Sequence, residues 1–165
     1  MTFAALAGDL AERGIDLTDR RRVDPVVVEH IESGRRISAV EAKRDDLLRT
    51  RVLGGFLAAF DQVDVVLSPT VGVAGVSNRE AIEQGGPATV EGRAVDPYLG
   101  WVLTVPVNFC GFPAASVPAG QVGGLPVGLQ VIAPHGREDL CLRVVAALEQ
   151  ALPWRSSYGI TGSSM

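Results

Sequence analysis

Apolar residues recur every three or four positions through the first part of the chain, a spacing that indicates helices. A short amphipathic helix is predicted over residues 2–13. A second helix is predicted after Asp24, a good capping residue, with Pro25 in its first turn. Gly34 can adopt the left-handed conformation that often ends a helix, so the second helix is expected to stop there. The arginines at 20–22 are predicted to be a solvated linker.

A third helix is predicted from a capping sequence at its start. Ser38 and Glu41 stand three positions apart, which lets each side chain bond the other residue's free backbone amide. An apolar stripe then continues to Phe60. The Gly54–Gly55 pair inside this helix costs about 1 kcal/mol per glycine relative to alanine. The pair indicates either close approach by another element or a weak point in the helix.

The period of the apolar positions changes after the third helix. A short β-branched run from Val63 to Leu67 predicts a buried strand, and further strands are predicted at Ala115–Val117 and Val127–Ala133. A final helix is predicted from Arg137 to Leu152, with apolar residues along one face. The first and last of these strands are largely apolar, so we expect them to be central in a sheet and covered on both faces.

The segments between the strands carry little periodicity. Residues 71–96 are rich in Gly, Ser, Asn and Pro and are predicted to be a long loop, which in a compact domain is usually a functional lid or a disordered segment. A short helix is expected from Pro97 to about Leu103, followed by a run broken by prolines. The chain begins with helices and continues with strands mixed with helices, and this order predicts an α/β layer structure. Three strands make a poor sheet alone, so another part is expected to complete it.

Composition narrows the class of protein. The 165 residues are enough for one domain, and 47% hydrophobic with 21% charged residues is typical of a globular protein. A net charge of −4 gives no electrostatic reason to expect nucleic acid as a partner. The N-terminal residues lack the basic start and apolar core of a signal peptide, and no run approaches the roughly 20 apolar residues of a membrane span. We therefore expect a cytoplasmic protein that binds no membrane.

Cysteine and histidine are the other candidates for chemistry. Cys110 and Cys141 lie among apolar neighbours and are expected to be buried thiols, with a single disulfide as the alternative. Cys110 could pair with His30 or His135 as a thiol–imidazole dyad, but its apolar surroundings favour an inert thiol. The spacing of these four residues does not match a metal site, and neither a metal nor another cofactor is expected.

Three segments together resemble the amidase signature family in their order and spacing. They are VDVVLSPT from Val63, TVPVNFCGFPAASVPAG from Thr104, and GLPVGLQVIAP from Gly124 followed by the helix that begins REDLCLRV. The resemblance covers about residues 24–155 and implies the C-terminal part of that fold, with helices packed on a few strands of an incomplete mixed sheet. Residues 1–23 would be an N-terminal helix and linker, and residues 156–165 a flexible tail.

The resemblance implies hydrolysis of carboxylic amide C–N bonds by a serine nucleophile in a Ser–cis-Ser–Lys triad. In the family the triad lies upstream of the matched segments, and no residue of this sequence matches it. Lys43, the only lysine, is predicted to be a solvated helix residue, while Ser163 and Ser164 fall in the tail, where nothing would fix a nucleophile. We therefore expect no catalytic residue and no activity from this chain alone. The alternative is a non-catalytic binding module derived from the same fold.

The resemblance also implies which residues would line a substrate pocket. In the family the segment that corresponds to residues 98–108 packs towards the acyl pocket, so the candidates are Tyr98, Trp101, Thr104 and Asn108. Each could instead be structural: Trp101 as core, Thr104 as a helix cap, Asn108 as a turn residue that bonds the backbone. Glutamine-using members tend to carry an acid here, and its absence from YLGWVLT favours a neutral or apolar amide. A separate N-terminal amidase half or a second copy of the chain is the expected partner.

Overall fold

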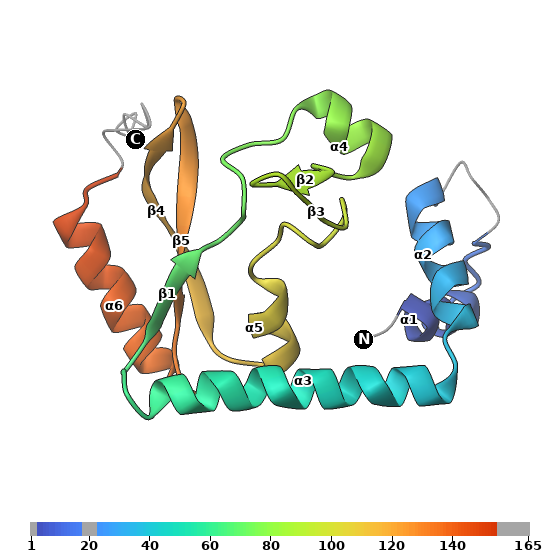
Figure 1. The fold of residues 1–165 in the computed structure, drawn as a ribbon, viewed down its shortest axis with the longest axis horizontal. Helices are drawn as coiled ribbons and strands as arrows, with labels where there is room; N and C mark the ends of the chain where they lie inside the picture. Colours follow the sequence, from blue (N-terminus) through green and yellow to red (C-terminus); the bar gives the residue numbers. More distant parts are fainter. Residues whose placement is uncertain (1–2, 18–22, 155–165) are drawn as a thin grey trace. The chain divides into compact units, whose positions relative to one another are not determined.

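The computed structural model describes residues 3–17 and 23–154 (Figure 1). The chain divides into two compact units, Met1–Leu48 and Arg49–Met165. The first unit contains α1 (Phe3–Glu12), α2 (Pro25–Arg36) and the beginning of α3 (Ala39–Phe60). The remainder of α3 and the elements that follow belong to the second unit. The linker at 20–22 and the tail at 156–165 lie outside the described residues.

In the first unit, α1 and α2 pack on each other, and Ile31 of α2 is only 1% exposed. The predicted start of α2 is confirmed, because the Asp24 carboxylate accepts a hydrogen bond from the Val26 backbone amide at 2.8 Å. The predicted end at Gly34 is wrong, since α2 continues to Arg36. The helix ends because Ile37 is extended, with φ −69° and ψ 123°, and not through a left-handed glycine.

The capping box at the start of α3 is confirmed. The Ser38 backbone amide donates to Glu41 Oε2 at 2.9 Å, and the Glu41 amide donates to Ser38 Oγ at 3.2 Å. Lys43 lies in the first turns of α3, where its ammonium pairs with Asp46 at 3.3 Å and its side chain is 74% exposed. The predicted solvated position of this lysine is therefore confirmed.

The second unit contains a three-stranded antiparallel sheet in the order β1 (Val66–Pro69), β5 (Leu125–Ile132), β4 (Ala114–Val122). The position of β5 at the centre confirms the prediction for that strand. The same prediction is wrong for β1, which within the described part of the chain pairs with β5 alone. The apolar composition of the β1 segment has another cause, because Val65 and Val66 contribute to the cores on opposite faces of the sheet.

Each face of this sheet carries its own apolar core, and α5 (Val105–Cys110) and α6 (Glu138–Ala151) lie on opposite faces. Ile132 packs with Phe112 and Val107 of α5, and the aromatic rings of α3 join them. Phe112 lies 5.2 Å from Phe56 and 5.3 Å from Phe60 between ring centroids. The second core is formed around Val131, Ala133 and Cys141. The predicted α/β layer structure is thus observed.

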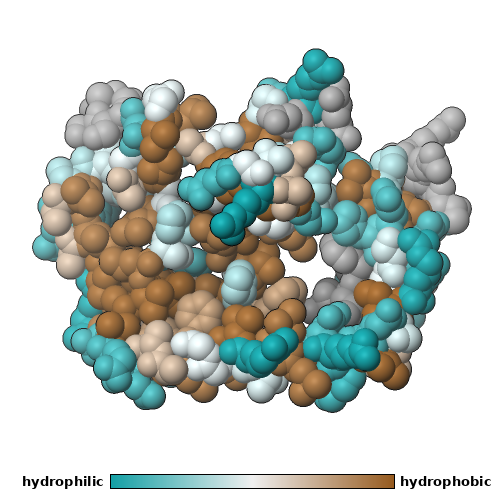
Figure 2. Space-filling view, viewed as in Figure 1, coloured by the Kyte–Doolittle hydropathy of each residue, from teal (hydrophilic) through white to brown (hydrophobic). Residues whose placement is uncertain are grey.

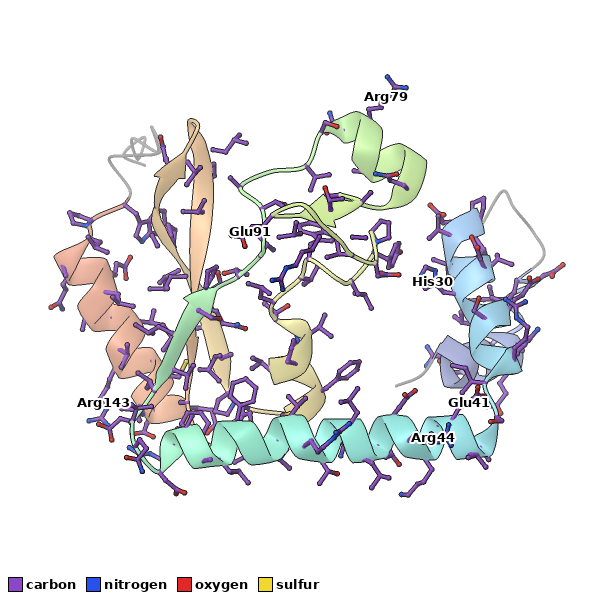
Figure 3. All side chains as sticks on the ribbon, viewed as in Figure 1. His30, Glu41, Arg44, Arg79, Glu91 and Arg143 are labelled. Carbon is purple, nitrogen blue, oxygen red and sulfur yellow. The ribbon has the colours of Figure 1, made fainter. Side chains whose placement is uncertain are left out.

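The long loop predicted over residues 71–96 is instead ordered secondary structure. It contains α4 (Asn78–Gln84) and a hairpin of β2 (Thr89–Val90) and β3 (Arg93–Ala94). The hairpin turns at Glu91 and Gly92, both with positive φ (48° and 76°), as two-residue hairpin turns require. Figure 3 labels Glu91 at this turn and Arg79 on α4. We refer to residues 73–100 as the excursion.

The helix predicted from Pro97 to Leu103 is wrong, because this stretch forms turns and α5 begins only at Val105. The Asp96 carboxylate accepts hydrogen bonds from the amides of Tyr98 at 3.0 Å and Leu99 at 2.8 Å. Aspartate side chains that bond nearby amides in this way compete with helix formation. Pro106 then sits in the first turn of α5, where its missing N–H costs no hydrogen bond.

Candidate substrate-lining site

Tyr98 and Trp101 lie against a glycine pair that follows α4. A Cβ atom on Gly85 would stand 2.7 Å from the Tyr98 ring, and one on Gly86 would stand 2.5 Å from Trp101 Nε1. Trp101 Nε1 donates a hydrogen bond to the Pro97 carbonyl oxygen at 2.8 Å. The indole is therefore half-buried and fixed in orientation by the excursion itself.

Thr104 and Asn108 lie one turn apart at α5. Thr104 is at the N-cap position, but its side chain makes no capping hydrogen bond to the described backbone, so the expected cap role is not observed. Asn108 Nδ2 donates to the Thr104 carbonyl oxygen at 3.1 Å, which confirms that it bonds the backbone, although within a helix. The four candidates thus form two pairs, one held by the glycines and one on α5.

A polar row on the α5 face of the sheet was missed by sequence reasoning. Gln130 of β5 is only 2% exposed, and its Nε2 donates to Ser68 Oγ of β1 at 3.0 Å. Thr70 Oγ1 and Ser116 Oγ of β4 are hydrogen-bonded at 2.9 Å. All four residues fall inside the family-like segments, but only the pairing of β1, β5 and β4 shows that they meet.

The histidines do not engage a thiol in the way a nucleophilic dyad requires. His135 Nε2 donates to the Cys110 carbonyl oxygen at 2.9 Å, and the imidazole stacks on Phe112 with centroids 4.2 Å apart. His30 Nδ1 donates to the Val26 carbonyl oxygen at 2.8 Å, one turn back in its own helix. These bonds give both imidazoles structural roles.

Both cysteines are free thiols, so the disulfide alternative is not realised. Cys141 is buried, and its Sγ donates to the Val131 carbonyl oxygen at 3.5 Å. Burial raises the pKa of the Cys141 thiol above its usual value, because the thiolate is disfavoured away from water. Cys110 is half-buried. The predicted buried thiol is therefore confirmed for Cys141 and only partly met by Cys110.

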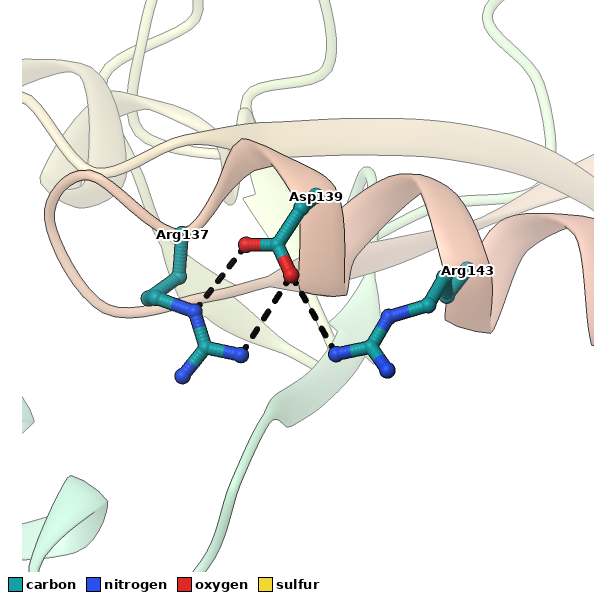
Figure 4. A network of polar contacts seen from close by, with 3 residues as sticks. All are labelled: Arg137, Asp139 and Arg143. Atoms are coloured by element: carbon teal, nitrogen blue, oxygen red, sulfur yellow. Dashed lines mark hydrogen bonds and ion pairs between the residues drawn. The ribbon is translucent and has the colours of Figure 1, made fainter.

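Charged side chains cluster at the start of α6. Asp139 lies between two arginines, 3.0 Å from Arg137 Nε and 3.2 Å from Arg143 NH2 (Figure 4). The hydrogen bond from Arg137 is the main cause that lowers the pKa of the Asp139 carboxyl below its usual value. The three groups are exposed, and a carboxylate in the first turn is favourable for the helix dipole. This network therefore stabilises the beginning of a helix.

Residues 3–17 and 23–154 lack two other kinds of site. This part of the chain holds no group of three or more His, Cys, Asp or Glu residues placed to bind a metal ion. It also holds no helix with the length and apolar character needed to cross a membrane.

Comparison with known proteins identifies the family. The family model described as Amidase matches residues 12–142. An acylamidase of Rhodococcus erythropolis is 34% identical over 137 residues, which are 82% of this chain and 28% of that protein. A glutamyl-tRNA(Gln) amidotransferase subunit of a Synechococcus strain is 39% identical over 110 residues, 65% of this chain and 19% of that protein.

The fold agrees with this relationship. The solved structure of a bacterial aryl acylamidase of the amidase signature family matches with a TM-score of 0.82 and 33% identity. That match covers 98% of this chain and 34% of the solved chain. The chain belongs to the amidase signature family, and it spans about a third or less of the length of the relatives it matches.

Proposed function

We propose that this chain is the C-terminal part of an amidase-signature hydrolase, and that the complete enzyme hydrolyses carboxylic amide C–N bonds. The observation that carries the proposal is the match of nearly the whole chain to about a third of an aryl acylamidase. The order of the family-like segments supports a C-terminal position. The complementary part of the fold would reside in a separate polypeptide or in further sequence of the same protein.

The chemistry of the chain supports the proposal that it is inactive alone. No residue matches the serine nucleophile, the bridging serine or the lysine of the family's triad. A general-base lysine must be neutral, which requires burial or a neighbouring cation. The Lys43 side chain is instead 74% exposed, with its ammonium 3.3 Å from the Asp46 carboxylate, so it lacks the burial that such a role needs. The missing groups would therefore be supplied by the rest of the fold.

The contribution of this chain would be one wall of the acyl pocket. We assign that wall to Tyr98, Trp101, Thr104 and Asn108, with Trp101 as its main apolar surface. The hydrogen bond to Pro97 and the fit against Gly86 hold the indole in one orientation, as a pocket wall requires. Glutamine-using members of the family tend to carry an acid in this neighbourhood, and its absence from residues 98–104 favours a neutral or apolar amide. The relatives named acylamidase and aryl acylamidase are consistent with this substrate class.

The proposal is tested by complementation. The chain is co-expressed with the part of an aryl acylamidase that the match leaves uncovered, and hydrolysis of a simple anilide is measured. We expect activity only when both parts are present, and a loss of kcat/KM for the Trp101→Ala assembly. Lys43→Ala is the matched control and leaves activity unchanged. Turnover by the purified chain alone, abolished when one of its own serines is replaced, contradicts the proposal.

A non-catalytic binding module is the second candidate. It is favoured by the second unit having apolar cores on both faces of its sheet, as an independent domain would. This candidate predicts a monodisperse chain that unfolds in one cooperative transition and confers no activity on the complementary part. Association with that part, together with anilide hydrolysis, decides for the amidase.

A further inference from the structure

Thr70 joins the sheet to the base of the excursion through three separate hydrogen bonds. Its backbone amide donates to the Gly128 carbonyl oxygen of β5 at 3.0 Å. Its hydroxyl is bonded to the hydroxyl of Ser116 in β4 at 2.9 Å. On the other side, its carbonyl oxygen accepts a hydrogen bond from the Leu103 amide at 3.1 Å. Thr70, the residue that follows β1, thus contacts β5, β4 and the returning chain.

The hydroxyl bridge depends on a glycine in the central strand. A Cβ atom on Gly128 would stand 2.6 Å from Thr70 Oγ1 and 2.8 Å from Ser116 Oγ, closer than real Cβ contacts. The two hydroxyls therefore meet directly above the Gly128 backbone and span the sheet from β1 to β4. Any side chain at Gly128 would push them apart.

The excursion leaves and re-enters at a narrow point that we call the neck, residues 70–72 and 101–103. Besides the Thr70–Leu103 bond, the Gly72 amide donates to the Trp101 carbonyl oxygen at 2.8 Å, and Val71 and Val102 form an isolated antiparallel bridge. The backbone of Trp101 is thus tied to the chain two residues beyond Thr70. The position of the neck over the sheet sets the position of the indole.

We propose that Thr70 and Ser116 are positioning residues whose hydroxyl bridge fixes the neck, and with it Trp101, relative to the sheet. The inference rests on the proposed function for the role of Trp101 as a pocket wall. Its structural part, the coupling of the bridge to the neck, stands on the hydrogen bonds alone. Without the bridge the neck opens while β4 and β5 remain paired.

A purely structural bridge would have a different signature. It would lower the stability of the whole second unit, and amides throughout β4 and β5 would lose protection from hydrogen exchange together with those of the neck. A positioning bridge instead lowers protection locally, because a sub-global opening exposes only the amides that it frees. The neck amides of Gly72 and Leu103 report this opening directly.

The experiment measures hydrogen exchange at single amides in Thr70→Val, which removes the hydroxyl and retains the shape of the side chain. We expect protection of the Gly72 and Leu103 amides to fall several-fold, up to about tenfold, as the loss of one hydrogen bond predicts. Protection in the β4–β5 ladder stays unchanged. Thr70→Ser restores the neck protection, since it returns a hydroxyl. Ser68→Ala is the matched control, because it removes a hydroxyl from the same sheet face without touching the bridge.

Ser116→Ala removes the same bridge from its other end and keeps the test usable if the Thr70 variant does not fold. In the double variant the loss of neck protection should be no greater than in either single variant, because both substitutions remove the same hydrogen bond. Uniform loss of protection across the unit, or unchanged neck protection in both single variants, overturns the proposal. In the complemented enzyme the bridge variants should raise KM for an anilide more than they lower kcat. If the complemented assembly is inactive but the variants still open the neck selectively, the proposed function is refuted and the positioning role of the bridge is supported.

Discussion

Adding a side chain at different glycines of this chain is expected to have opposite effects on stability, depending on the surroundings of each glycine. Gly86 is buried, and a methyl group there would collide with the Pro97 carbonyl oxygen and with Trp101. Gly54 lies in α3, and apart from its chain neighbours and the surrounding helix backbone no described atom would lie within 4 Å of a Cβ there. Packing therefore requires glycine at position 86, whereas the glycine at position 54 only weakens a helix.

We predict that Gly86→Ala lowers the free energy of unfolding by about 1–3 kcal/mol, because the added methyl group overpacks the site. The matched substitution Gly54→Ala should raise it by about 1 kcal/mol through helix propensity. Urea unfolding followed by circular dichroism measures both. Equal effects of the two substitutions would show that neither environment matters as described.

The two thiols should differ in reactivity. Cys141 is buried and its pKa is raised by burial, so it presents little thiolate at the surface. We predict that in the Cys110→Ala variant an aromatic disulfide reagent modifies Cys141 only as fast as the second unit opens, and rapidly in denaturant. In the Cys141→Ala variant the half-buried Cys110 should react faster. Fast native reaction of Cys141 would contradict its buried position.

At the scale of the element, the capping box makes the start of α3 sensitive to acid. Hydrogen bonds from Ser38, first from its backbone amide and then from its hydroxyl, lower the pKa of the Glu41 carboxyl. A depressed folded-state pKa contributes stability above the unfolded pKa, which is about 4.3 for glutamate. That contribution is lost as the pH falls from this value through the lower folded-state pKa.

We predict that helicity near the start of α3 declines over this acidic range in the natural chain and less in Glu41→Gln, which caps without titrating. Carbon-13 chemical shifts of residues 39–42 during a titration from pH 6 to pH 2 measure the effect. Glu29→Gln in α2 is the control, with a decline equal to that of the natural chain. A decline of the same size in Glu41→Gln would refute the prediction.

Elements with local signals could be predicted from the sequence, and elements fixed by distant contacts could not. Asp24 and the Ser38–Glu41 pair mark the starts of α2 and α3 because caps act within one turn. By contrast, Asp96 diverts the chain from the helix predicted there through side-chain bonds to backbone amides. The hairpin at Glu91–Gly92 had only two-residue strands, too short for an alternating pattern.

The candidate site, too, could be predicted from the sequence only in part. Its four residues came from the family resemblance, and their contacts with the glycines after α4 are visible only in the fold. The Thr70–Ser116 bridge joins residues 46 positions apart in sequence. Such a pair cannot be identified without knowing that both strands flank β5, because neither hydroxyl carries a local signal.

At the scale of the whole molecule, the second unit presents many large apolar side chains to water. Figure 2 shows apolar residues gathered over β1 and the elements beside it. Phe109 of α5 is 58% exposed, and Leu67 of β1 is 49% exposed. The exposed large apolar residues of this unit include Leu57, Val63, Leu67, Leu99, Leu103, Phe109, Val122, Leu125, Leu142 and Leu152. Surface of this kind commonly marks an interface.

We predict that the isolated chain self-associates at micromolar concentration. The apolar surface favours contact between copies, and so do the outer edges of β1 and β4, which pair with no further strand among the described residues. Sedimentation velocity measures the effect. Adding the complementary amidase part should convert the assemblies to a single species of fixed stoichiometry. The Leu67→Lys variant should associate less, whereas Gln62→Lys, which adds the same charge at an exposed polar position, is the control for a general gain in solubility. A monomer at all concentrations would favour the binding module.

The neck has a consequence for how this part of the molecule can vary. Residues 72 and 101 are in direct contact, so the stretch between them begins and ends at the same place. Its length therefore does not affect the distances between the strands of the sheet. Loop-closure entropy rises only slowly with length, so such a stretch tolerates growth, trimming or wholesale exchange. A stretch from another family member, inserted between these two positions, would replace Tyr98 and the glycine pair that contacts Trp101 while leaving the sheet unaltered.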